Sequence, residues 1–355
     1  MGRLKFHWAS PLDSGQQKAA GDYSTGAFDL EGLIEFSQAA ESAGISSLLM
    51  GISYHMPDPI ALIGALARET TTVKFILAYR PGLVSPTLFA QMVNTISWIN
   101  NGRIDLNIVA GISPAEQAYY GDYCDHAQRY RRTSEFLQIA SQLWSADQPV
   151  SYDGEFYRIT EAELGLSFKD NRKPFIYLSG GSSAAQQVAA RHADCLLRYG
   201  DAPDKLKQQA QEVHASGIQF GIRMHVIARE TQQQAHAFIA EMMRDPDEAH
   251  KAEIADFVAK CDSEAVRKSF DLAEQAEGEW LTPMIWSGAV AYRGGPALSI
   301  VGSYQQVAEY LLEYRRAGID EFILSGWPTR DEMERFCKEV LPRYHELEDS
   351  FEAVL

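Results

Sequence analysis

Apolar, strand-like segments alternate with amphipathic, helix-like segments along most of this chain, and this alternation constrains the fold more than any other feature. The segment 73–78 (VKFILA) is a continuous apolar run, typical of a strand buried on both faces. Pro86 then opens a helix that Asn101-Gly102 ends, and 104–110 is the next apolar run. Since parallel strands need crossover connections of this kind, the order predicts an α/β fold with a parallel sheet.

The number of strands favours a closed barrel. Strands are expected near residues 6, 48, 76, 107, 177, 197, 224 and 323, about eight in all, which is the number that closes a TIM (β/α)8 barrel. A doubly wound open sheet is the alternative, but no GxGxxG follows the first strand and no GxxxxGK occurs. A chain of 355 residues fits one barrel. We therefore expect one TIM-barrel domain over residues 1–355.

Two segments interrupt the alternation. Residues 149–166 contain YDGEFYRI, an Asp-Gly turn between aromatic strands, which predicts an inserted hairpin. Residues 244–303 lack the alternation for about sixty residues, longer than ordinary connections, which predicts a mobile lid or a binding insertion. Within it, 262–277 is expected to be helical, and 292–296 (YRGGP) is expected to be mobile.

Charge and composition exclude several classes of partner. The formal net charge is -16 and no basic cluster is present, which argues against a nucleic acid or an anionic membrane as the main partner. No apolar run has membrane-spanning length, so the cytoplasm is the expected location. The four cysteines are far apart and form no CxxC pair, so we expect neither a metal site nor a disulfide framework.

The strand 220–230 (FGIRMHVIARE) carries two polar side chains on one face. Alternation along a strand places Arg223 and His225 on the same side, opposite Met224. Burying both groups unpaired is costly, so this side is expected to face a wet cavity or an anion site. A salt-bridged strand end is an equal alternative, because structural ion pairs produce the same pattern.

Further candidates follow other strands, where a barrel of this type places its active site. Gly180-Gly181-Ser182-Ser183 stands between a strand and a helix, so its backbone N–H groups can hold a phosphate, although such turns also cap helices without a ligand. Ala110 ends another strand, and His126 with Tyr130 begins the next helix; together they could line a cofactor. The alternatives are that His126 bonds the backbone and that Arg129 and Arg131 form a solvated face. Arg80-Pro81-Gly82 reads more simply as a turn.

Seven segments together resemble one protein family. They are RPGLVSPTLFAQ (80–91), NGRIDLNIVAG (101–111), DHAQRYRRTSEF (125–136), GGSS (180–183), FGIRMHVIARE (220–230), YRGGPALSIVG (292–302) and AGIDEFILSGWP (317–328). The chain resembles the bacterial luciferase-like flavin monooxygenases, most closely the two-component alkanesulfonate monooxygenases. The resemblance implies a TIM barrel that uses O2 and reduced FMN from a separate NAD(P)H-dependent reductase. It also implies a homodimer or homotetramer.

The resemblance also assigns residues. Gly180, Gly181, Ser182 and Ser183 would hold the FMN phosphate with help from Tyr130 and His126, and Ala110 replaces a Thr that lies near the flavin. The family's polar set maps onto Arg223 as a permanent cation, His225 as a proton donor near neutral pH, and Arg293 as a charge delivered by the lid. The substrate wall departs from the family at three positions, which are Met56 in place of Cys, Tyr199 in place of Trp, and Trp327 in place of a catalytic-site Tyr.

The expected activity is oxygenation of a small anionic organic compound, first of all desulfonation of an alkanesulfonate to an aldehyde and sulfite. Three alternatives stay open: tailoring of a natural product or another organosulfur or acidic substrate, a deazaflavin-dependent oxidoreductase that transfers hydride, and a flavin-binding protein without turnover.

Overall fold

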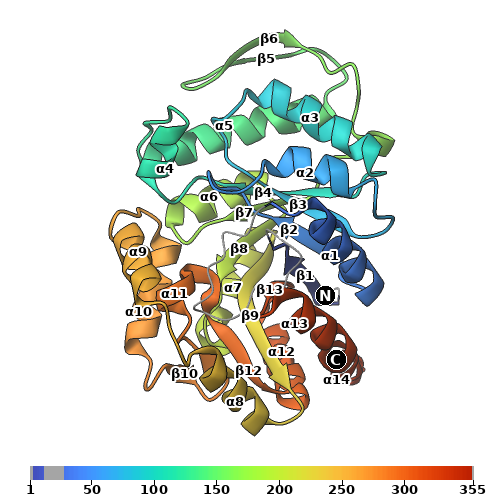
Figure 1. The fold of residues 1–355 in the computed structure, drawn as a ribbon. Coiled ribbons are helices and arrows are strands. Elements are labelled where there is room, and N and C mark those ends of the chain that lie inside the picture. Colours follow the sequence, from blue (N-terminus) through green and yellow to red (C-terminus); the bar gives the residue numbers. More distant parts are fainter. Residues whose placement is uncertain (1–2, 12–27, 354–355) are drawn as a thin grey trace.

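The computed structural model describes residues 3–11 and 28–353. Eight parallel strands form a closed barrel, because the order β9-β13-β1-β2-β3-β4-β7-β8 ends with a pairing of β8 to β9 (Figure 1). The strands are β1 (Lys5–Ala9), β2 (Ser47–Met50), β3 (Lys74–Tyr79), β4 (Ile104–Val109), β7 (Ile176–Ser179), β8 (Cys195–Tyr199), β9 (Gln219–Arg229) and β13 (Glu321–Ser325). The predicted TIM barrel is confirmed, and every expected strand is present.

Helices surround the barrel and alternate with its strands. They are α1 (Leu30–Ala43), α2 (Pro59–Leu66), α3 (Pro86–Ile99), α4 (Pro114–Tyr119), α5 (His126–Ser145), α6 (Ser183–His192), α7 (Pro203–Ala215), α8 (Gln232–Met242), α12 (Tyr304–Ala317), α13 (Thr329–Arg335) and α14 (Leu341–Glu352), with a π-helix over Phe336–Val340. The repeated Ala-Gly-Ile pattern ends α1 and α12 in the same way, since Gly44 and Gly318 both adopt the left-handed conformation at φ 85° and 98°. The Gly-containing segment 12–27 after the first strand lies outside the described residues.

The core has two layers, one between strands and helices and one inside the barrel. The inner layer consists of Leu49, Ile76, Ala78, Tyr177, Cys195, Leu197 and Ile323. On β9, Ile222, Met224 and Val226 are fully buried toward the helices. Arg223 lies opposite Tyr199 of β8 and Ile323 of β13, so it faces the barrel axis as the strand alternation predicts.

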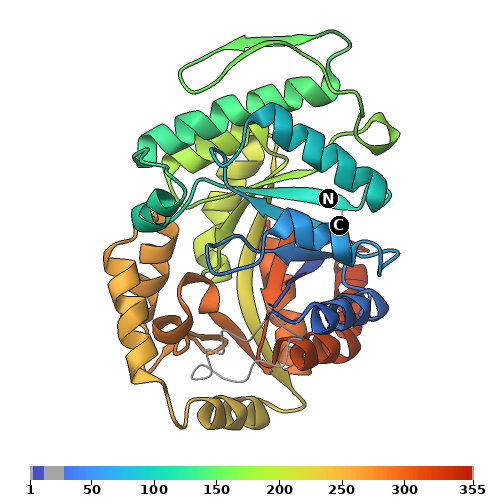
Figure 2. The same ribbon diagram turned by 45° about the horizontal axis from the view of Figure 1, so that its top comes forward.

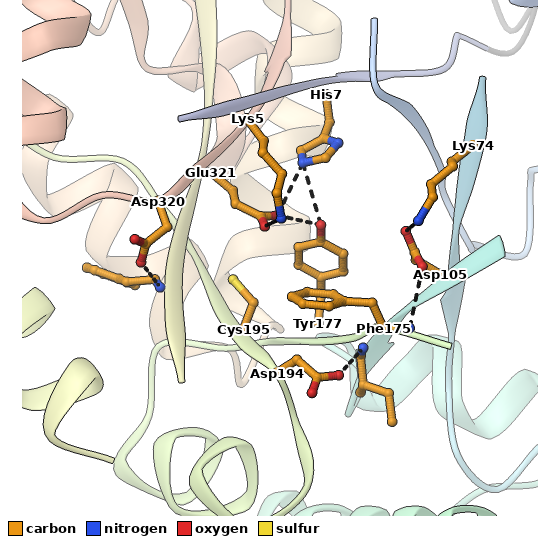
Figure 3. Close-up of polar contacts among 12 residues, drawn as sticks. Lys5, His7, Lys74, Asp105, Phe175, Tyr177, Asp194, Cys195, Asp320 and Glu321 are labelled. Carbon is orange, nitrogen blue, oxygen red and sulfur yellow. Dashed lines mark hydrogen bonds and ion pairs between the residues drawn. The ribbon is translucent and has the colours of Figure 1, made fainter. Parts of the chain in front are cut away.

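A polar network closes the N-terminal end of the barrel (Figure 3). Glu321, which is fully buried, accepts hydrogen bonds from the Tyr177 hydroxyl and from Lys5 Nζ at 2.6 Å, and its Oε2 lies 3.2 Å from His7 Nε2. Burial and the Glu321 carboxylate raise the pKa of Tyr177, so its hydroxyl remains a donor. These groups come from β1, β7 and β13 and lie at the end opposite the usual active-site mouth, so they serve barrel closure.

Both predicted interruptions are present. The hairpin consists of β5 (Val150–Asp153) and β6 (Arg158–Ala162) and projects beyond α3 and α5 (Figures 1 and 2). The insertion after α8 is folded: it contains α9 (Glu248–Ala259), α10 (Glu264–Gln275), β10 (Trp280–Thr282), β11 (Ile285–Trp286), α11 (Val290–Arg293), a 3-10 turn over Gly295–Ala297, and β12 (Ser299–Ser303). β12 pairs with the second half of β9. The expected mobility of this insertion stays a prediction.

Candidate active site

A cavity of about 820 Å³ opens at the C-terminal ends of the barrel strands. Its barrel wall comes from every barrel strand except β13, namely from Ala9, Leu49, Ala78, Asn107, Val109, Ser179, Tyr199 and Arg223. Ser179 Oγ donates to Asn107 Oδ1 at 2.7 Å, which fixes the polar groups of β7 and β4 side by side. A cavity of this size at this end of a barrel is the expected place for a cofactor and a substrate.

The start of α6 forms an anion cradle, which we define as Gly180, Gly181 and Ser182. Ser182 caps the helix by accepting a hydrogen bond from the Ala185 N–H at 3.2 Å, and the Tyr130 hydroxyl bonds to Ser182. A Cβ on Gly180 would lie 2.7 Å from the Tyr130 hydroxyl oxygen, and one on Gly181 would lie 2.9 Å from the Ala265 nitrogen. Glycine is therefore required here by close approach, and the free N–H groups of the first turn suit a phosphate.

The other predicted cofactor residues divide between the cavity and the surface. Ala110, His126 and Tyr130 line the cavity with the cradle, and the rings of His126 and Tyr130 lie 5.0 Å apart. Ser183 is exposed and is not among the described lining residues. Its side chain therefore faces away from the cavity, although its backbone belongs to the first turn of α6.

Arg129 is a buried structural residue, so the solvated-face interpretation is wrong for it. Its side chain is 1% exposed, whereas that of Arg131 is 52% exposed. Arg129 donates to the Ala110 carbonyl at 3.0 Å and to both carboxylate oxygens of Asp262 at 2.7 and 2.8 Å. One side chain thereby ties the end of β4 and helix α5 to the insertion.

Arg223 supplies a cation to the cavity wall. It lines the cavity, its side chain has no hydrogen bond or ion pair within the described part of the chain, and its Nε is buried without a partner. Burial lowers the pKa of Arg223, while the neighbouring Tyr199 opposes this effect. Because a half-buried guanidinium without a partner is costly, this arrangement favours a site that receives an anion over the salt-bridged alternative.

His225, Arg293 and Trp327 are not among the described residues that line this cavity. His225 stacks on Trp327 with ring centroids 4.1 Å apart, and its Nδ1 donates to the Pro296 carbonyl at 2.9 Å. Burial lowers the pKa of His225 to about 3, the Pro296 hydrogen bond opposes the shift, and the charges of Arg223 and Arg293 add to it. The low pKa favours the neutral imidazole at pH 7, and the expected role of His225 as a proton donor stays a prediction.

Three segments line the cavity that the sequence did not single out for this role. They are the loop 51–56, of which only Met56 was predicted; helix α4; and one face of α9 with the start of α10, which was predicted only as part of a lid or binding insertion over 244–303. Arg80, expected to belong to a simple turn, is 3% exposed, lines the cavity and forms an ion pair with Glu116 at 2.9 Å. The sequence signal that could have indicated this role is the position of Arg80 directly after β3, because barrels of this type place their active-site residues at the C-terminal ends of strands.

Some features are absent from the described residues. No three His, Cys, Asp or Glu side chains in residues 3–11 and 28–353 are grouped so that they could hold a metal ion. Within the same ranges, no helix combines the length and apolar character that a membrane crossing needs. Cys124, Cys195, Cys261 and Cys337 are free thiols.

The fold and the site together define a (β/α)8-barrel protein with a ligand cavity and an anion cradle at its C-terminal mouth. Residues 4–321 match the family model "Luciferase-like monooxygenase", and the chain belongs to this family. This agrees with the resemblance seen in the sequence at the level of the family; the closer likeness to alkanesulfonate monooxygenases stays a prediction.

Solved structures share the fold at low sequence identity. The chain is similar to EDTA monooxygenase (EmoA) from Chelativorans sp. BNC1, with a TM-score of 0.78, 18% identity, and coverage of 97% of this chain and 94% of that chain. It is similar to DmoA from Hyphomicrobium sulfonivorans, with a TM-score of 0.80, 16% identity, and coverage of 98% and 89%. The FMN complex of the oxygenating constituent of 3,6-diketocamphane monooxygenase from Pseudomonas putida gives a TM-score of 0.68, 18% identity, and coverage of 96% and 99%.

Proposed function

We propose that this chain is the oxygenase component of a two-component flavin system that oxygenates a small anionic organic substrate. The observation that carries the proposal is the unpaired Arg223 guanidinium in the same cavity as the anion cradle. One cavity thus offers two anion sites, one for a cofactor phosphate and one for a substrate head group. An NAD(P)H-dependent reductase would deliver reduced FMN, and the chain would act as a homodimer or homotetramer in the cytoplasm.

The residues of the cradle suit FMN because their geometry excludes side chains and supplies N–H donors. Gly180, Gly181 and Ser182 would hold the phosphate, with Tyr130 and His126 beside it and Ala110 lining the flavin side. When bound, reduced FMN supplies the two electrons that activate O2. The insertion lines the cavity through α9 and the start of α10, and its closure over the bound flavin would exclude water.

Arg223 would bind and orient the substrate anion, with Tyr199 and Met56 beside it on the substrate wall. For an alkanesulfonate, the C–S bond breaks, sulfite leaves, one atom of O2 becomes the aldehyde oxygen, and the other leaves as water. His225 is neutral and stacked on Trp327, so its role would be to hold Trp327 and the 3-10 turn carrying Pro296 behind the Arg223 wall. Arg293, which is likewise not among the described residues that line the cavity, would also act from behind this wall by supporting the residues that line it.

The test is anaerobic titration with reduced FMN, followed by oxygen and a substrate panel. We expect tight binding of reduced FMN, weak binding of oxidised FMN, and O2 consumption coupled to product with anionic substrates. The panel compares alkanesulfonates, carboxylates, sulfones and neutral thioethers. If only neutral compounds were oxidised, Arg223 would not bind the substrate. If the protein reduced a deazaflavin without O2 uptake, the hydride-transfer alternative would be favoured.

A further inference from the structure

Exposed aromatic side chains form a rim at the outer part of the cavity that neither the cradle nor Arg223 explains. Tyr54 comes from the loop after β2, Tyr119 is the last residue of α4, and both line the cavity. Tyr54 is 60% exposed and Tyr119 is 67% exposed. Their rings meet edge to face, with centroids 5.2 Å apart and an interplanar angle of 77°. Large rings left in water at the mouth of a cavity are surface that a ligand can bury.

The rim is held in place by a buried ion pair. Glu116 Oε1 accepts a hydrogen bond from the Tyr54 backbone N–H at 3.0 Å and another from Arg80 Nη2 at 2.9 Å. The side chains of Arg80 and Glu116 are 3% and 10% exposed. The loop that carries Tyr54 and the helix that carries Tyr119 are therefore fixed against each other, which lowers the entropy that a ligand loses when it binds between them.

The opposite wall is the apolar face of α9. Ile254 and Phe257, about one turn apart, both line the cavity and are half-buried, yet neither belongs to the apolar core among the described residues. His250 is the only residue of α9 that is buried. Figures 1 and 2 both place α9 next to α4. A helix normally buries its apolar face against the core, whereas this one faces a cavity, so a ligand would complete its packing.

We propose that the rim slot, defined as Tyr54, Tyr119, Ile254 and Phe257, binds an aromatic ring carried by the substrate. This rests on the proposed function: the substrate is then an aryl-substituted organic anion, with its anionic group at Arg223 and its ring in the slot. An aromatic ring is favoured over an alkyl chain because the two tyrosines offer ring faces and edges, and an aromatic pair adds stabilisation beyond the buried area. The slot thereby selects among the anions that Arg223 accepts.

The test is equilibrium binding to the whole protein, measured by calorimetry without turnover. The probes are phenylalkanesulfonates and phenylalkanoates of increasing chain length, each paired with the alkyl anion that lacks the ring. We expect the best phenyl compound to bind the wild type about tenfold more tightly than its alkyl partner. Tyr54→Ala and Tyr119→Ala should each lose most of that advantage and leave alkyl binding unchanged.

Tyr123→Ala is the matched control, because Tyr123 is 84% exposed and is not among the described lining residues. It should keep the full advantage of the phenyl compounds. The proposal that the rim slot binds an aromatic ring would be wrong if the wild type bound phenyl and alkyl anions equally, or if Tyr119→Ala kept the full phenyl advantage. A loss of reduced FMN affinity in Tyr119→Ala would assign the slot to the cofactor and overturn it as well. These binding measurements need no turnover. If the protein consumed no O2, the proposed function would be wrong, but the aromatic slot could still be confirmed or excluded by the binding data.

Discussion

At the scale of single residues, Arg223 decides what the cavity can bind, because it is a permanent charge whose Nε is buried without a partner. Arg223→Met should make the ligand-free protein more stable, by about 1 kcal/mol or more in the free energy of unfolding, because an unpaired charge is replaced by an apolar side chain. The same change should reduce kcat/KM for an anionic substrate by about a hundredfold or more, since it removes a preorganised charge. Thermal unfolding and steady-state kinetics check both parts. A variant that loses both stability and activity would point to a structural role.

Gly180 tests the cradle at the same scale. Gly180→Ala would place a Cβ 2.5 Å from the Ala185 side chain and 2.7 Å from the Tyr130 hydroxyl, so Tyr130 must move. We expect the affinity for reduced FMN to fall about tenfold or more, measured by anaerobic titration. Gly165→Ala is the matched control because nothing lies within 4 Å of its Cβ position. If the two variants bound reduced FMN with equal affinity, the FMN phosphate would not bind at this loop.

At the scale of elements, the insertion is attached to the barrel by the Arg129–Asp262 pair. Asp262→Asn leaves the buried Arg129 with a weaker partner, so we expect the free energy of unfolding to fall by about 1–3 kcal/mol. Limited proteolysis should then cut within 244–303 sooner than in the wild type, because the insertion opens more often. Glu155→Gln is the matched control, since the Arg131–Glu155 pair also has two hydrogen bonds but is about half exposed. First cleavage in the 149–166 hairpin would contradict this attachment.

The helices and strands also show which features could be predicted from the sequence and which could not. Helix α3 has the predicted bounds because local groups set them: Ser85 caps it and Pro86 occupies its first turn. Arg223 could be placed because strand alternation fixes which side chains share a face. Helix α4 was missed because six residues are too short for a periodic pattern. The roles of Arg80, Ile254 and Phe257 depend on contacts between segments far apart in the chain, which local patterns do not contain.

At the scale of the whole molecule, the network in Figure 3 joins the first, fifth and last strands of the barrel, so its charge state couples barrel closure to pH. Burial alone would raise the pKa of Glu321. The hydrogen bonds and charges of His7 and Lys5 outweigh that effect and lower the pKa from 4.5 to about 2. Ionised Glu321 is therefore favoured by folding, and its contribution is fully present above pH 4.5.

We predict that this contribution, on the order of 3 kcal/mol, is lost as the pH falls from 4.5 to about 2. Glu321→Gln should lower the free energy of unfolding by a similar amount at pH 7 and should flatten its dependence on pH in that window. Asp105→Asn is the matched control at the same barrel end, because burial raises the pKa of Asp105 despite Lys74, so its ionised form is not favoured by folding. Denaturant unfolding at several pH values measures all three proteins. A Glu321→Gln variant that retains the acid sensitivity of the wild type would show that other carboxylates control barrel closure.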